Sequence, residues 1–106
     1  MFELSWSADY PHHQDFLDVL FSSGSEYNYG DYSNADYDAL IAKANLTQEK
    51  NQGFALYRQA EQMLVDGAGC IPLTFGESYY LVKPHVKGFY YSPLGFASLN
   101  EVTITK

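Results

Sequence analysis

An acid beside an indole, close to the beginning of the chain, is the pair of side chains best suited to chemistry. Trp6 ends a short run in which Phe2, Leu4 and Trp6 alternate with polar residues, and this period of two predicts a half-buried strand. Asp9 follows, and Pro11 then forces a turn. A carboxylate next to an indole suits a positively charged group on a small ligand. The same pattern also allows a purely structural interpretation, with Trp6 in the core and Asp9 capping the next turn or helix.

The composition predicts one folded domain. Of the 106 residues, 46% are hydrophobic and only 18% are charged, which argues against disorder. The formal net charge is −7, and eight of the thirteen acidic residues lie in residues 1–45, where Lys43 is the one basic residue. Because no basic patch is available to neutralise phosphates, this acidic part argues against nucleic-acid binding. It is compatible with cationic ligands, and equally with an ordinary solvated face.

The aromatic residues, the single cysteine and the apolar runs narrow the class of protein further. The ten Tyr and seven Phe residues fit a small-molecule pocket as well as an aromatic core. A single cysteine, Cys70, permits no internal disulfide and predicts a small buried apolar side chain. No apolar run approaches the roughly 20 residues that span a bilayer, and no secretory signal pattern follows Met1.

Hydrophobic periodicity predicts three helices, over residues 12–21, 34–44 and 47–66. Ser33 or Asn34 would cap the second helix, Thr47 would cap the third, and Gly67 would end it. The apolar faces expected to form the core consist of Phe16, Leu17, Leu20, Phe21, Tyr37, Leu40, Ile41, Ala44, Leu56, Tyr57, Ala60, Met63 and Leu64.

After residue 70 the pattern changes to that of strands, so the chain is of the mixed α/β class. Residues 71–75 and 78–82 flank the turn-like pair Gly76-Glu77, which predicts a hairpin. Residues 84–95 contain two prolines and two glycines and predict an irregular crossover. Residues 102–105 are rich in β-branched side chains and predict a final strand.

The motif Trp6-Ser7-Ala8-Asp9-Tyr10-Pro11, followed by Asp15-Phe16-Leu17, resembles the W-x-A-D-Y-P…F-L segment of a family of ABC-transporter substrate-binding proteins. This is the oligopeptide/dipeptide-binding family, extracytoplasmic solute-binding protein family 5. The similarity continues in order through residues 28–34, 37–38, 55–62, 71–73 and 81–89. His13 stands where many relatives carry a proline, which leaves the motif intact.

The resemblance implies a partial type II periplasmic-binding-protein fold, formed by the C-terminal fragment of a longer receptor. Residues 1–83 would form part of the C-terminal ligand-binding lobe, and residues 84–106 would cross back and add a final strand to the other lobe. The missing signal peptide would then lie in an absent N-terminal part, and the full-length protein would be extracytoplasmic, periplasmic or membrane-associated at the cell surface. Strand edges left unpaired in the isolated chain predict self-association or strand exchange.

The resemblance also implies a binding site. In peptide-binding members of the family, the acid of the W-x-A-D motif pairs with the α-ammonium group of the peptide. Here that acid is Asp9, and Trp6 would stand on the pocket wall. The implied ligand-binding residues are Trp6, Ala8, Asp9, Tyr10, Asn28 and Tyr29. The loop that carries Asn28 also fits an ordinary turn.

Enzymatic and metal chemistry are not expected. The sequence contains neither a strand–turn–helix nucleophile elbow nor a Gly-rich phosphate loop. His12-His13, with Asp15 and Asp18 nearby, lacks metal-ligand spacing, because adjacent histidines point to different faces of a helix. The prediction therefore includes no catalytic residue, no metal and no other cofactor.

The predicted function is oligopeptide or dipeptide binding for ABC-type import, by hinge closure around the ligand and delivery to the permease subunits in the membrane. The isolated chain would bind peptide weakly or not at all. Two alternatives stay open. The first is a non-peptide cargo, because the same family also includes receptors for solutes such as sugars or nickel complexes. The second is a stand-alone interaction domain. That last hypothesis predicts a folded monomer whose contacts centre on Tyr27, Tyr29 and Tyr32.

Overall fold

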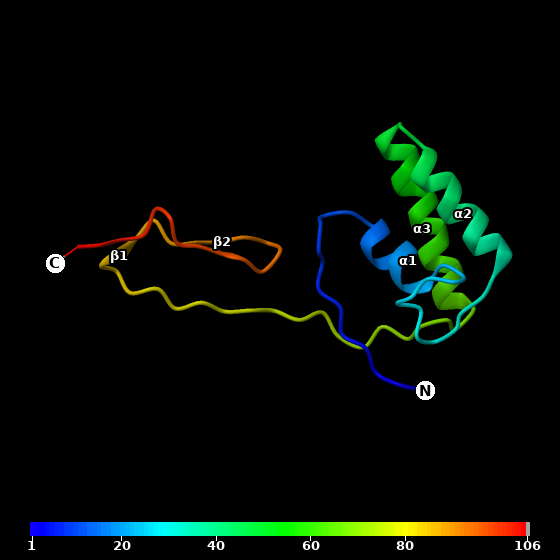
Figure 1. Cartoon of the computed structure of the whole chain (residues 1–106), viewed down its shortest axis with the longest axis horizontal. Helices are drawn as coiled ribbons and strands as arrows, with labels where there is room; N and C mark the ends of the chain where they lie inside the picture. Colours follow the sequence, from blue (N-terminus) through cyan, green and yellow to red (C-terminus); the bar gives the residue numbers. More distant parts are fainter. Residues whose placement is uncertain (106) are drawn as a thin grey trace. The chain divides into compact units, whose positions relative to one another are not determined.

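The computed structural model describes residues 1–105 and divides the chain into two compact units, Met1–Pro72 and Leu73–Lys106. The first unit contains three helices that pack on one another, drawn in blue, cyan and green in Figure 1: α1 (Gln14–Phe21), α2 (Ala35–Leu46) and α3 (Lys50–Asp66). The second unit contains four short strands: β1 (Val86–Lys87), β2 (Tyr90–Tyr91), β3 (Ala97–Ser98) and β4 (Thr103–Ile104). Helices and a few strands are therefore both present.

The ends of the helices are set by local capping. The Asn34 side chain accepts hydrogen bonds from the backbone N–H groups of Asp36 and Tyr37, at 3.0 and 3.1 Å. Asn34 and not Ser33 is therefore the N-cap of α2. Gly67 ends α3 as predicted. The prediction for Thr47 is wrong, because its hydroxyl donates to the Lys43 carbonyl at the end of α2. The Glu49 carboxylate caps α3 in its place.

The core of the first unit lies between the three helices, and its main part is the packing of α2 on α3. Tyr37 is fully buried in it, and its hydroxyl donates to the Leu17 carbonyl at 2.7 Å, which ties α2 to α1. Burial raises the pKa of the Tyr37 hydroxyl, and neighbouring Tyr32 adds to this. Among residues 1–105, eight apolar side chains are buried, and all eight belong to the predicted core: Leu17, Leu20, Tyr37, Ile41, Ala44, Tyr57, Ala60 and Leu64.

The predicted apolar face of the first helix is only partly correct. Leu17 and Leu20 are buried, but Phe16 is 38% exposed. Asp15 instead points inward and is 1% exposed. The helix also begins at Gln14 and not at His12, since residues 9–13 form bends and a turn before it. Hydrogen bonds to the preceding segment account for the inward position of Asp15.

The strand predicted at the beginning of the chain is not formed. Residues 1–8 lack regular secondary structure, and Phe2 and Leu4 are 56% and 44% exposed. A strand needs a neighbouring strand to satisfy its N–H and C=O groups. Among residues 1–105, none pairs with this segment in a strand ladder.

The hairpin predicted around Gly76-Glu77 is also wrong. Residues 71–83 contain no strand ladder, and every residue from 71 to 85 is exposed. A two-stranded hairpin by itself is marginally stable in water, and it needs further strands or a packed helix to persist. Residues 71–82 are exposed, and the aromatic contact made within them is that of Tyr80, whose ring lies against that of Tyr91 in β2 with centroids 3.9 Å apart.

The second unit contains two antiparallel pairs. β1 pairs with β4, with Val86 opposite Ile104, and β2 pairs with β3, with Tyr90 opposite Ser98. The final strand predicted over residues 102–105 is thus confirmed at Thr103–Ile104. It has a partner within the chain, and that partner lies in residues 84–95, which the sequence predicted to be irregular. Gly88 has a φ of +72°, and a Cβ there would lie 2.0 Å from the Glu101 carbonyl oxygen, so only glycine fits this turn.

Candidate functional site

The segment Trp6–Asp9 is held by one buried carboxylate. Oδ2 of Asp15 accepts a hydrogen bond from the Trp6 indole Nε1–H at 3.3 Å and another from the Asp9 backbone N–H at 2.8 Å. The two donors stand at opposite ends of a four-residue segment, so a single oxygen fixes both ends against α1. In the sequence Asp15 stands out only within the motif and beside His12-His13. Helical periodicity does not signal its burial, because it lies two positions from Leu17 and therefore on a different side of α1.

The Asp9 side chain is exposed, while the Asp9 backbone N–H is held by Asp15. Ala8 is half-buried beside it. Tyr10 is 37% exposed, and its hydroxyl donates to Oε1 of Gln14 at 3.1 Å. Partial burial, followed by the negative charges of Asp15, Asp18 and Asp9, raises the pKa of the Tyr10 hydroxyl. The Asp9 carboxylate is therefore open to a ligand from solvent.

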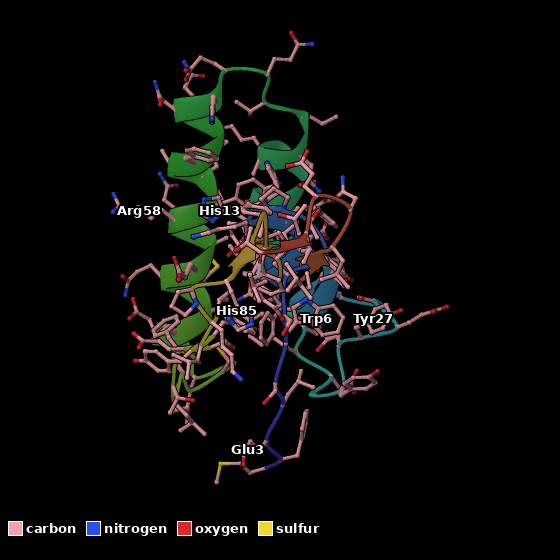
Figure 2. All side chains as sticks on the ribbon, turned by 90° about the vertical axis from the view of Figure 1, so that its left-hand side faces the viewer. Glu3, Trp6, His13, Tyr27, Arg58 and His85 are labelled. Carbon is pink, nitrogen blue, oxygen red and sulfur yellow. The ribbon has the colours of Figure 1, made fainter. Side chains whose placement is uncertain are left out.

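Trp6 begins a line of aromatic rings. Its ring meets that of Tyr27 edge to face with centroids 5.5 Å apart, and the two side chains are neighbours in Figure 2. The Tyr27 ring meets that of Tyr29 at 6.4 Å. Tyr29 is 60% exposed, whereas Trp6 is half-buried. The structure thus brings together Trp6 and Tyr29 of the predicted site through Tyr27, which the predicted set of ligand-binding residues omitted.

Asn28 organises the loop that carries these tyrosines. Its Nδ2 donates to the carbonyls of Ser22 and Tyr32, at 3.2 and 2.8 Å, and its Oδ1 accepts from the Tyr32 N–H at 3.0 Å. The side chain is half-buried and its amide is engaged within the loop on both ends. The immediate role of Asn28 is to shape residues 22–32. The Tyr32 ring turns inward and packs edge to face on Tyr37, with centroids 5.3 Å apart.

Two surface hollows lie in the first unit. An open hollow of about 470 Å³ includes Tyr27, but neither Trp6 nor Asp9, and its lining consists of Asp18, Val19, Ser22, Ser23, Gly24, Ser25, Glu26 and Tyr27. None of the predicted ligand-binding residues lines this hollow. A second hollow of about 370 Å³ lies between residues 11–12 and residues 44–57.

His12 and His13 pack against aromatic rings of α3. His13 stacks on Tyr57 with ring centroids 5.7 Å apart and meets Phe54 edge to face at 5.0 Å. His12 meets Tyr57 edge to face at 5.3 Å. Figure 2 shows His13 against α3, while Arg58 points away from that side of the helix. Within residues 1–105, no group of three or more histidine, cysteine or acidic side chains is placed to hold a metal ion.

Asp18 joins α1 to its neighbours. Its carboxylate accepts hydrogen bonds from Ser22 Oγ at 2.6 Å, Asn45 Nδ2 at 2.8 Å and Gln14 Nε2 at 3.2 Å. Partial burial alone would raise the pKa of Asp18, but these hydrogen bonds outweigh it and the pKa is lowered. The charged form is thus favoured in the folded state.

This lowered pKa predicts a pH-dependent stability. The contribution of Asp18 is complete above its unfolded pKa of about 3.9 and is lost as the pH falls through the lower folded value. Asp18→Asn should lower the free energy of unfolding at pH 7 by up to about 1 kcal/mol, since the carboxylate is partly exposed. It should also flatten the decline of stability below about pH 4. Urea unfolding at pH 7 and in acid measures both effects, and an unchanged acid slope in the variant would contradict the assignment.

Comparison with known proteins identifies relatives along most of the chain, although no family model matches it. A probable deoxycholate-binding periplasmic protein of Escherichia coli is 40% identical over 85 residues, which is 80% of this chain. The dipeptide-binding protein DppE of Bacillus subtilis is 32% identical over 100 residues, or 92% of this chain. The periplasmic oligopeptide-binding protein OppA of Escherichia coli is 32% identical over 84 residues, or 79% of this chain.

The matches are confined to a small part of each relative. This chain spans 16% of the deoxycholate-binding protein, 18% of DppE and 15% of OppA. All three are named as binding proteins and none as an enzyme. The family resemblance of the Trp6–Pro11 motif is thereby confirmed: along most of its length the chain is similar to periplasmic substrate-binding proteins of the oligopeptide/dipeptide-binding family, family 5.

Proposed function

We propose that this chain is a C-terminal segment of a receptor that binds oligopeptides or dipeptides outside the cytoplasm for ABC-type import. The observation that carries the proposal is the Trp6–Asp9 segment, which Asp15 holds so that an exposed carboxylate stands beside a line of aromatic rings. Relatives named as dipeptide-binding and oligopeptide-binding proteins support it. The short share of their length that the chain spans supports a place within a longer protein.

The recognition step would be an ion pair between Asp9 and the α-ammonium group of the peptide. A charge-assisted hydrogen bond of this kind is roughly twice as strong as a neutral one. The Trp6 ring would form the adjacent wall, where its face favours a cation. Ala8, Tyr10, Asn28 and Tyr29 complete the proposed set. Because the ion pair reads only the backbone terminus, it sets the register of the peptide and leaves its side chains unread.

In the longer receptor, the chain would contribute to a type II periplasmic-binding-protein fold. Residues 1–83 would belong to the ligand-binding lobe and residues 84–106 to the return toward the other lobe. The exposed, alternating residues 71–82 support this placement, since they would then have a sheet to join. Hinge closure would trap the peptide, and the closed form would deliver it to the permease subunits in the membrane. Among residues 1–105, none of the helices has the length and apolar character to cross a bilayer.

Calorimetric titration of the full-length receptor with one short peptide tests the proposal. The peptide is used with a free and with an acetylated N-terminus, which removes the ammonium charge. We expect the free form to bind and acetylation to weaken it about ten- to hundredfold, as for the loss of a hydrogen bond to a charged group. Asp9→Asn should cause a similar loss for the free peptide.

Glu3→Gln is the matched control. Glu3 is an exposed acid in the same N-terminal segment, and Figure 2 shows it away from Trp6. This variant should bind the free peptide as the wild type does. Equal binding of free and acetylated peptides by the wild type would remove Asp9 from the proposed role.

A non-peptide cargo is the second candidate, favoured by the relative named as a deoxycholate-binding protein, which is 40% identical. Deoxycholate has no ammonium group, so Asp9 would lack a counter-charge in such a complex. This candidate predicts that the receptor binds neither form of the peptide. It also predicts that Asp9→Asn leaves the affinity for a bile acid unchanged or higher, which the same calorimetric titration measures.

A further inference from the structure

The Asp15 carboxylate occupies a position where a negative charge is costly unless donors compensate it. The side chain is 1% exposed and lies in α1 two positions before Leu17, on a different side of the helix from that core residue. A buried carboxylate without partners would lose its hydration and gain little in return. Its compensation comes from Trp6 and Asp9, outside its own helix.

A carboxylate suits this arrangement better than the amide of the same shape. The indole N–H of Trp6 and the backbone N–H of Asp9 are both donors, and an ionised carboxylate only accepts. Both donors meet the same oxygen, Oδ2, so an asparagine could offer them its one acceptor oxygen, but only as a neutral acceptor and with an NH₂ group in place of Oδ1. The charge of Asp15 thus strengthens two hydrogen bonds that an asparagine would make only in their weaker, neutral form.

We propose that Asp15 is a positioning residue for ligand recognition, whose buried carboxylate holds the Trp6 ring and the Asp9 backbone so that the Asp9 carboxylate meets the cationic group of the ligand. For its ligand, this inference rests on the proposed function. The two hydrogen bonds that Asp15 accepts from Trp6 and Asp9, called the clamp below, do not depend on that function. The shape of the binding wall is then set by a residue that never touches the ligand. Preorganisation of this kind improves affinity by lowering the cost of ordering the site on binding.

The clamp is tested first without a ligand, in the 106-residue chain. Trp6 is the single tryptophan, so fluorescence excited at wavelengths that the ten tyrosines do not absorb reports on its ring alone. Asp15→Asn should shift the emission to longer wavelength, and by NMR the Asp9 amide should exchange about tenfold faster, as expected for loss of one charge-assisted hydrogen bond. A wild-type emission spectrum and wild-type exchange at Asp9 would overturn the inference.

Asp18→Asn is the matched control for this measurement. Asp18 lies on the same helix and also accepts hydrogen bonds, but its three side-chain partners all lie outside residues 6–9. The control should leave the Trp6 emission and the Asp9 exchange at their wild-type values, even where it lowers stability. An equal change in both variants would indicate general loosening of α1 and would also overturn the inference.

The ligand arm uses the full-length receptor and a short peptide with a free N-terminus. Asp15→Asn should weaken binding about tenfold, and the same change in an Asp9→Asn background should have little further effect, since the two residues act in series. If the clamp is lost but the peptide affinity is unchanged, Asp15 has no role in recognition. If the wild type binds no peptide, the proposed function fails, and the fluorescence and exchange data still decide the clamp.

A second variant covers the case in which Asp15→Asn does not fold. Trp6→Phe keeps an aromatic ring but replaces the indole with a smaller ring that has no N–H, so one of the two donors to Asp15 is lost. The Asp9 amide should then exchange faster while the helical content stays at its wild-type level by circular dichroism. Unchanged exchange at Asp9 in this variant would show that the segment is held by other means.

Discussion

Leu64→Ala is expected to lower the free energy of unfolding of the helical unit by about 2–5 kcal/mol, the usual cost of truncating a fully buried leucine. Leu64 is 1% exposed and lies in α3 among the side chains that join this helix to α2. The truncation removes apolar burial and leaves a cavity that closely packed helices fill only in part. For a domain of ordinary stability this is a large fraction of the total. Urea unfolding followed by circular dichroism measures the loss.

Leu46→Ala is the matched control for this experiment. It is the same substitution at the last residue of α2, but the Leu46 side chain is 84% exposed. Its effect should stay within about 0.5 kcal/mol of zero, as for other surface substitutions. Similar losses for Leu64→Ala and Leu46→Ala would contradict the packing of α3 on α2 as the centre of the core.

The 106-residue chain is expected to self-associate as its concentration rises, through the extended residues 71–82. Phe75 and Leu81 are 95% and 100% exposed there, and within residues 1–105 no backbone–backbone hydrogen bond engages residues 71–82. A long, flat, apolar strand edge is a template for pairing with another copy. Sedimentation velocity across a concentration series should show dimers or larger species at high concentration.

Charges placed on this segment should suppress the association. A Phe75→Lys and Leu81→Lys double variant introduces like charges that oppose edge-to-edge pairing. Leu46→Lys is the control, because it charges a similarly exposed leucine on a helix. A wild-type chain that stays monomeric at every concentration would contradict the prediction and favour the alternative of a stand-alone interaction domain. In that case the exposed rings of Tyr27 and Tyr29 become the surface to test.

The helices were predictable because the information that forms them is local. The apolar residues of α2 and α3 repeat with the helical period, and Asn34 and Gly67 mark two of their ends. The error at Thr47 arose because threonine serves equally well as a cap or as a partner for the preceding helix. Its hydroxyl bonds backward to Lys43, and Glu49 satisfies the free N–H groups of α3.

The strands were less predictable because a strand is completed by a partner elsewhere in the protein. Residues 1–6 and 71–82 have the right alternation, yet pairing is a property of two segments and not of one. The final strand met a partner, since Gly88 allows a turn close to Glu101 and β1 then lies beside β4. Nothing in the period of residues 84–95 signals that pairing.

The sequence by itself determined the three helices, most of their buried face and the family of the chain, because periodicity, capping residues and an ordered set of motifs are written along a single segment. It also singled out Trp6 and Asp9. Only the tertiary structure decided that Asp15 turns inward and binds both ends of that segment, and that Tyr27 extends the aromatic wall. These contacts join residues that come together only after α1 has packed. A buried polar residue has no visible partner in the sequence until the fold supplies one.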